Sequence, residues 1–436
     1  MRAYVWLIWA GLTAHSFPAH PQAQVNPGSS FIREIELTRA AGLPVSPKDM
    51  VRHRPPADQN AAPLYRKAWE LMRPHQKGGP SEAISDLVGS RIPGPEAIER
   101  GRKALAKGAA ALELLHRAAS LPRCSFARDW SLGAAMLFPE FSQFRESARW
   151  LAGEAYLLLV DDKPLEAIRV YELVFQVARH SAEDSILLAY LVGTAIEAIS
   201  RTGLGHVLHR AGDDDAVATA VITALDRRPK LSLSYSLRGE IVMQLVSLEM
   251  LRKDGPSGLE ELAGLTAGDD AKKRKSLPPS RGWSGIMDAN GVFLLRTMRK
   301  LIAAADLPYA RATPIFHQIS MSLDTDSKVD RAVALIAMPM TENLAESPAR
   351  AEARTSCVRA GAHVLKWRAE HGTWPDGLNE AMSPAATDPF SDQPLKYRQE
   401  GAGFVVYSPG PTGKFTGGTP GEKKRGEAVF RYPARP

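Results

Sequence analysis

Hydrophobic residues recur at three- and four-residue spacing through most of this chain, which is the period of an α-helix. The clearest segments are residues 141–160 and 165–181, joined by the polar sequence DDKP. Proline at a first helical position needs no amide donor, and acidic residues suit a helix N-terminus. The two segments therefore predict an antiparallel helical hairpin.

The same period predicts helices on both sides of this hairpin. They span residues 60–72, 96–121, 184–210, 213–228, 232–253, 286–305, 315–323, 328–338 and 349–371, with a shorter one over 31–41. Gly372 directly follows the last helix, and glycine commonly terminates helices.

After Gly372 the pattern changes from helical spacing to short β-branched and aromatic runs. Residues 395–398 alternate, 400–403 supply a turn, and 404–408 and 428–432 read as further strands, the last at an edge.

A two-stranded hairpin alone is marginally stable in water, so these strands need a partner. We expect them to pack on the helix that ends at His371, with much of a small core supplied by Trp374, Phe390, Tyr397 and Phe404.

These elements predict a mainly α protein of antiparallel helical hairpins, a repeat-like bundle, with a small C-terminal α+β tail that contains a β-hairpin. The expected organisation is a signal peptide (1–23), an extended lead-in (24–59), a helical domain (60–252), a Gly/Pro/Lys-rich linker (253–284), a helical segment (285–371) and a β tail (372–436).

Small and apolar residues of the central hairpin fall at the offsets of a tetratricopeptide motif. They are Ala155, Leu158, Asp162, Ala167, Tyr171 and Val174. The hairpin resembles that motif, in which small residues let two helices approach closely. The period of about 34 residues does not return, because Ile196 stands at the next turn position, so a single repeat-like hairpin is expected.

The tail follows the order EHGTWPDGLNEA, DPFSDQPLKYR and FVVYSPGPTGKFTGG. Over residues 355–418 it resembles the globular end of the type II secretion major pseudopilins, where a helix leads to G-x-Y-P, then D-P-W-G-x-P-Y-x-Y, then a strand ending near S-x-G-x-D-G. The matching positions are Gly372, Trp374, Pro375, Leu378, Asp388, Pro389, Phe390, Pro394, Tyr397, Phe404, Tyr407, Ser408, Gly410 and Gly413. The resemblance implies a pseudopilin-like fold for the tail, and uncharacterised exported bacterial proteins are similar there.

Two departures limit what this resemblance implies. The preceding segment TENLAESPARAEA is too polar for the apolar helix that anchors and polymerises a pseudopilin. Thr412 stands where the family has an acidic calcium ligand, and Lys414 adds a positive charge. We therefore expect neither calcium binding nor fibre assembly.

The N-terminus is typical of a secretory signal: Arg2, an apolar run over residues 3–14, then Pro18. As a helix the run would rise about 18 Å, too short for a bilayer core of about 30 Å. Cleavage after Ser16 or Ala23 would leave a periplasmic or secreted protein with no stable transmembrane helix. An uncleaved anchor or a cytosolic start remains the alternative.

The net charge of +7 is mild for 436 residues, and the densest basic run, KKRK at 272–275, reads as a solvated loop or as a weak contact for anionic lipid or polymer. A nucleic-acid partner is not expected. Cys124 and Cys357 are either two buried thiols or one disulfide, and they are too few for a zinc site.

Two polar clusters contain residue types that can bind metals. His206 and His209 form H-x-x-H without a third ligand, so we expect a positively charged helix end there. The aspartates at 213–215 are expected to cap the next helix.

A third cluster, the acidic residues Asp324, Asp326 and Asp330, lacks the glycine and glutamate of an EF-hand, since Val329 and Leu335 occupy those positions. No phosphate-binding loop, dinucleotide fingerprint, nucleophile elbow or H-E-x-x-H motif is present.

The sequence thus predicts no catalytic, cofactor or metal residue. A binding or scaffolding protein of the bacterial cell envelope, whose partner is another envelope protein, is the favoured function. An exported hydrolase-type enzyme is the alternative.

Overall fold

The computed structural model describes residues 28–51, 55–75, 79–89, 92–255, 282–324, 344–416 and 427–433. The predicted signal peptide, the KKRK run at 272–275 and the predicted helix at 328–338 lie outside these residues.

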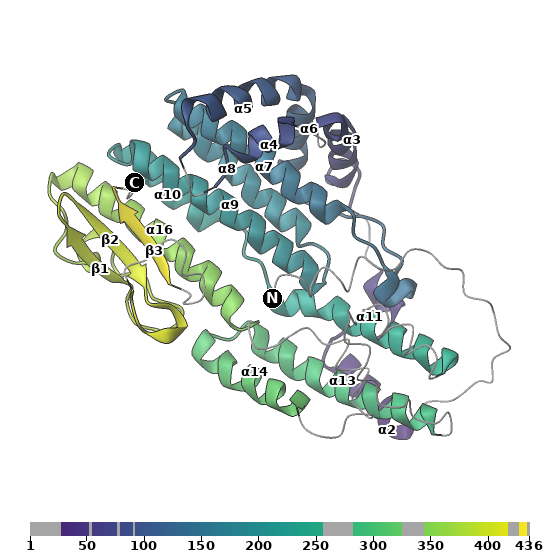
Figure 1. The fold of residues 1–436 in the computed structure, drawn as a ribbon. Coiled ribbons are helices and arrows are strands. Elements are labelled where there is room, and N and C mark those ends of the chain that lie inside the picture. The colour runs from purple at the N-terminus through teal and green to yellow at the C-terminus, as the bar shows by residue number, and fades with distance from the viewer. Residues whose placement is uncertain are drawn as a thin grey trace, which may run out of the picture.

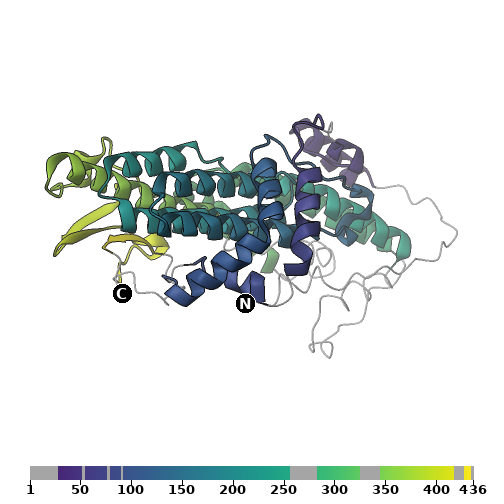
Figure 2. The same cartoon turned by 90° about the horizontal axis from the view of Figure 1, so that it is seen from above.

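The described part of the chain is a succession of helices followed by one small sheet (Figures 1 and 2). The helices are α2 (Ser29–Ala40), α3 (Ala62–Met72), α4 (Gly79–Ser85), α5 (Pro95–Lys107), α6 (Ala109–Ala119), α7 (Glu140–Val160), α8 (Pro164–Ser181), α9 (Leu187–Ala211), α10 (Asp215–Arg227), α11 (Leu233–Asp254), α13 (Trp283–Ala305), α14 (Tyr309–Asp324), α16 (Glu346–His371) and α17 (Leu378–Ala381). Two short 3-10 helices lie beside the site described below: η1 (Pro47–Met50) and η3 (Trp130–Ala135). The strands are β1 (Lys396–Glu400), β2 (Gly403–Ser408) and β3 (Ala428–Tyr432). The mainly α prediction is confirmed.

Helices α7, α8 and α9 form the packed centre of the body, and Pro164 begins α8 as predicted. Ala155 of α7 and Ala167 of α8 are fully buried. One turn after Ala167, Tyr171 of α8 lies against Gly203 of α9, and an added Cβ on Gly203 would come within 2.1 Å of the ring. Glycine at position 203 therefore allows α8 and α9 to pack closely.

The single helix predicted over residues 96–121 is wrong, because the chain breaks at Gly108 into α5 and α6. Gly108 lies against the fully buried ring of Trp150 on α7, and an added Cβ would come within 2.2 Å of that ring. The indole ring occupies the space at this break. Because Trp150 lies on another helix, the spacing of residues around Gly108 does not predict this contact. Helix α4, in the Pro- and Gly-rich stretch, was also not predicted.

Buried hydrophobic residues form two clusters. The larger runs through α3 to α10 and continues into α16 and the sheet. The smaller joins α2, α11, α13 and α14. Helix α11 contributes to both, with Val242 and Met243 in the larger cluster and Ile241 and Leu245 in the smaller. In Figure 1 the second group lies below the body, with α11 between them.

The tail is an antiparallel sheet of order β1-β2-β3, with Phe404 opposite Tyr432 across β2 and β3. It packs on α16, where Gly361 leaves room for Phe430: an added Cβ would come within 2.2 Å of that ring. Phe404 is fully buried, and its ring centre is 5.2 Å from that of Trp374. The prediction that the strands pack on the helix ending at His371 is confirmed.

Two of the four aromatic residues expected in the tail core are less central. Trp374 and Tyr397 are only half-buried, although both contact Phe404. Phe390 is buried, with its ring 4.9 Å from that of Tyr309 on α14. The tail core thus extends to a helix of the second cluster.

None of the described helices has the length and apolar character needed to cross a membrane.

Candidate binding pockets

The H-x-x-H pair of α9 does not form the positively charged helix end that the sequence suggested. His206 packs edge-on against Tyr156, and His209 stacks between α9 and the sheet on Phe430 and Tyr432. Burial lowers the pKa of both imidazoles, that of His209 to about 4, where the charge of His206 adds a smaller effect. Both rings are therefore neutral near pH 7.

The three aspartates at the start of α10 make separate contacts. Asp214 caps the helix as predicted, and its carboxylate accepts a hydrogen bond from the amide of Ala216 at 2.8 Å. Asp215 in the first turn pairs with Lys366 of α16 at 2.7 Å. Asp213 accepts from the hydroxyl of Tyr432. The cluster thus also ties the tail to the body.

The third, acidic cluster and the two cysteines can be followed only as far as the structure describes them. Asp324 is the last residue of α14, whereas Asp326 and Asp330 lie outside the described residues. Cys124 and Cys357 are both buried free thiols, and burial raises the pKa of each. Within the ranges described, no three His, Cys, Asp or Glu side chains gather as a metal site.

An open cavity of about 570 Å³ lies where the end of α2 meets the start of α11. We call it the arginine pocket, and it is lined by Arg39, Gly42, Leu43, Pro44, Asp49, Met50, Arg123, Ser185, Tyr235 and Arg238. Four separate segments contribute to it: residues 39–50 from the end of α2 to η1, the loop before η3, the loop between α8 and α9, and α11.

Close backbone packing brings the deep side of the pocket together. The amide of Gly239 on α11 donates to the carbonyl of Ser185 at 2.7 Å, and an added Cβ on Gly239 would come within 2.3 Å of that oxygen. The neighbouring Tyr235 donates its hydroxyl hydrogen bond to the carbonyl of Glu183. Glycine at position 239 therefore allows Arg238 and Ser185 to share one cavity.

A turn around Asp49 forms another part of the pocket lining. Its carboxylate accepts hydrogen bonds from the amide of Val45 and the hydroxyl of Ser46, both at 2.9 Å. The Val45 amide is the largest cause of a lowered pKa for Asp49, and Arg39 contributes a smaller attraction. Asp49 is therefore a fixed negative charge at neutral pH.

The pocket holds more positive than negative charge. Arg123 pairs with Glu183 at 3.3 Å. Arg39 and Arg238 are both exposed, and no carboxylate of the described residues lies within ion-pair distance of either. Since guanidinium groups stay protonated at any physiological pH, these two can attract an anion.

The hydroxyl of Ser185 is a further group in this pocket that lacks a hydrogen-bond partner within the described part of the chain. The residue is 1% exposed, and its buried hydroxyl has no hydrogen-bond partner among the described residues. A buried polar group left without a partner costs about 1–3 kcal/mol. A ligand acceptor in the pocket would supply the missing bond.

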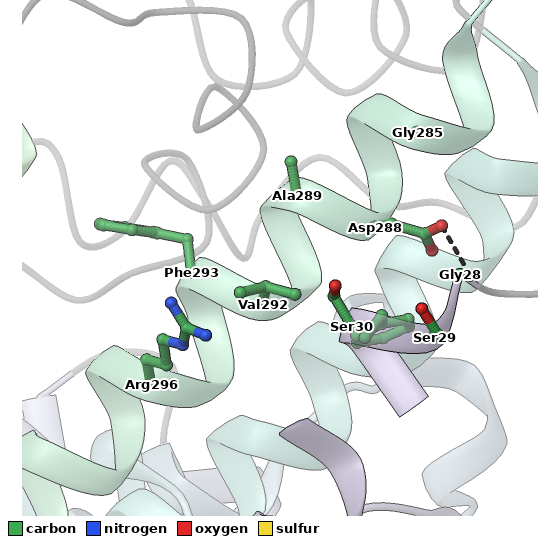
Figure 3. Close-up of a pocket in the computed structure, with 10 residues that line it drawn as sticks. Gly28, Ser29, Ser30, Gly285, Asp288, Ala289, Val292, Phe293 and Arg296 are labelled. Atoms are coloured by element: carbon green, nitrogen blue, oxygen red, sulfur yellow. Dashed lines mark hydrogen bonds between the residues drawn. The ribbon is translucent and has the colours of Figure 1, made fainter. Parts of the chain in front are cut away.

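A second open cavity, of about 580 Å³, lies between the start of α2 and α13 (Figure 3). Asp288 there accepts from the amide of Gly28 at 2.8 Å and from Arg252 at 2.7 Å. Arg296 pairs with Glu34 at 2.7 Å. Because the charges at this cavity are already paired within the protein, the arginine pocket is the better candidate site.

Comparison with known proteins adds no relative: neither a family model, nor a curated protein, nor a solved structure matches this chain. The fold is a mostly helical body with a small C-terminal three-stranded antiparallel sheet.

Sequence reasoning missed the arginine pocket entirely. Arg39, Arg123, Ser185 and Arg238 are isolated along the chain and match no motif. Only the fold brings these four segments to one cavity.

Proposed function

We propose that this protein is a non-catalytic binding protein of the bacterial cell envelope, and that it holds another envelope protein at the arginine pocket. The observation that carries this proposal is the pair Arg39 and Arg238, which lack carboxylate partners within the described residues and share a cavity with the unpartnered hydroxyl of Ser185. The secretory pattern at the N-terminus supports the envelope location. Packed helical hairpins are also common supports for protein-binding surfaces.

The chemistry of the pocket favours binding over hydrolysis. Arginine keeps its proton, so Arg39, Arg123 and Arg238 can attract and orient an anion but cannot act as general bases. A serine nucleophile needs a base within hydrogen-bond distance, and the hydroxyl of Ser185 has no such partner. The exported enzyme remains the alternative function, and it would need a different site.

The test is capture of envelope proteins by matched pairs of immobilised variants. Arg39→Ala combined with Arg238→Ala removes two charges from the pocket. Arg33→Ala combined with Arg311→Ala removes two charges from exposed positions of α2 and α14 outside it. We expect at least one envelope protein to be retained by the wild type and the control pair and to be lost by the pocket pair, as read by mass spectrometry.

Equal retention by the two pairs would overturn the proposal. Circular dichroism and thermal melting of each variant establish that the helical fold persists, so a loss of binding is not read from an unfolded protein.

A further inference from the structure

We infer that the arginine pocket takes a single carboxylate of its protein partner, carried next to an apolar side chain, and that Ser185 and Arg238 both donate to it. This inference rests on the proposed function and names the group that the pocket recognises.

The donors of the pocket suit a carboxylate. A guanidinium group offers parallel N–H donors that match the two oxygens of a carboxylate. Arg39 and Arg238 bring such groups with no carboxylate of the described residues within ion-pair distance, and Ser185 brings a neutral O–H donor from the buried side. The ligand would thus be held from the rim and from the interior at once.

The charge of the lining favours one negative charge over two. Three guanidinium groups and one carboxylate, that of Asp49, line the pocket, while Glu183 pairs with both Arg123 and Arg179. Asp49 is held ionised by its hydrogen bonds, and it would repel a dianionic phosphate more strongly than a carboxylate.

The wall beside the arginines is apolar. Leu43 and Met50 are buried and Pro44 is half-buried, and all three line the pocket. An aliphatic side chain next to the bound carboxylate would cover this wall and leave less apolar surface in water. Free inorganic anions lack such a group, so they gain nothing from this part of the pocket.

The experiment uses four probes with the full chain at low salt. They are the blocked peptide acetyl-Leu-Glu-Leu-amide, its Gln counterpart, its phosphoserine counterpart and inorganic phosphate. Dissociation constants come from isothermal titration calorimetry. We expect the Glu peptide to bind at least tenfold more tightly than each of the other three.

Substitutions test which side chains donate hydrogen bonds to the carboxylate of the peptide. Arg238→Ala should weaken the Glu peptide about ten- to hundredfold, because a hydrogen bond to a charged group is lost. Arg238→Lys should recover only part of that loss, since an ammonium group cannot pair with both oxygens. Ser185→Ala should weaken the Glu peptide several-fold and leave the Gln peptide less affected, whereas Arg33→Ala should change neither.

The outcomes separate this inference from the proposed function. Tighter binding of phosphate or of the phosphoserine peptide would overturn the carboxylate assignment while the partner capture still stands. Equal binding of the Glu and Gln peptides would also overturn it. If no probe binds although capture depends on Arg39 and Arg238, the inference fails alone; if capture is also insensitive to them, both fail.

Discussion

The hydroxyl of Tyr432, in the last strand, donates a hydrogen bond to the carboxylate of Asp213 at the start of α10, at 3.0 Å. The two residues are 219 positions apart in the chain. The same ring lies in a stack with His209 of α9 and Phe404 of β2. One tyrosine thus joins the sheet to two helices of the body.

Replacing Tyr432 with Phe should keep this stack and remove only the hydrogen bond. We expect a loss of about 0.5–1.5 kcal/mol in the free energy of unfolding, the usual range for one such bond. Hydrogen exchange should become faster in β3 and stay unchanged in α7 and α8. An unchanged β3 would show that the bond to Asp213 does not hold the sheet.

Phe404→Ala should loosen the tail more strongly than any exposed substitution there. The side chain is fully buried, and truncating a large buried aromatic typically costs about 3–5 kcal/mol. Hydrogen exchange should rise at residues 373–416 and 427–432 while the body stays protected. Phe415→Ala is the matched control, because Phe415 is only half-buried against Tyr407.

The tail and the body belong to one hydrophobic cluster, so they could also unfold together. Faster exchange spread through residues 100–250 would mean that the tail and the body unfold as one unit. Full protection at every residue would mean that Phe404 is not part of the core.

Two glycines in or beside helices should respond to alanine with opposite signs. At Gly108 the new methyl group would overlap the buried ring of Trp150, so Gly108→Ala should destabilise the protein by about 1–3 kcal/mol. At Gly205, inside α9, an added Cβ meets nothing within 4 Å, so Gly205→Ala should stabilise by about 0.5–1 kcal/mol. Denaturant titration measures both, and stabilisation by Gly108→Ala would show that α5 and α6 can join into the single helix that the sequence suggests.

The burial of His209 should make the protein less stable in mild acid. Burial lowers the pKa of its imidazole to about 4 in the folded state, against 6.5 when exposed. Between these values the unfolded chain binds more protons than the folded one, so stability falls as pH drops from 6.5 to 4. Above pH 6.5 this effect is absent.

Substitution of His209 with Phe removes this titration and keeps a ring against Phe430. Between pH 7 and pH 5 the variant should lose on the order of 1–2 kcal/mol less stability than the wild type. Thermal melts at a series of pH values measure the difference. Parallel pH profiles for the two proteins would mean that the imidazole is protonated equally in the folded and unfolded states.

The local patterns of the sequence determined the secondary structure of most described segments. Helix α8 begins at Pro164, α10 is capped by Asp214, and α16 stops at Gly372, which adopts the left-handed conformation with φ 75°. Each of these signals acts within one turn of the chain, so it can be read without knowledge of the fold. The three strands lie where alternation and β-branched residues predicted them.

Tertiary structure decided what depends on distant neighbours. Trp150 fills the space at Gly108, where a continuous helix was expected, and the sheet covers His209 and makes it neutral. The arginine pocket exists only because Gly239 lets α11 approach Ser185 and the chain after α2 folds over both. Periodicity indicates which face of a helix is apolar, but not which side chains from other segments contact that face. Those contacts determine burial, charge pairing and the shape of the pocket.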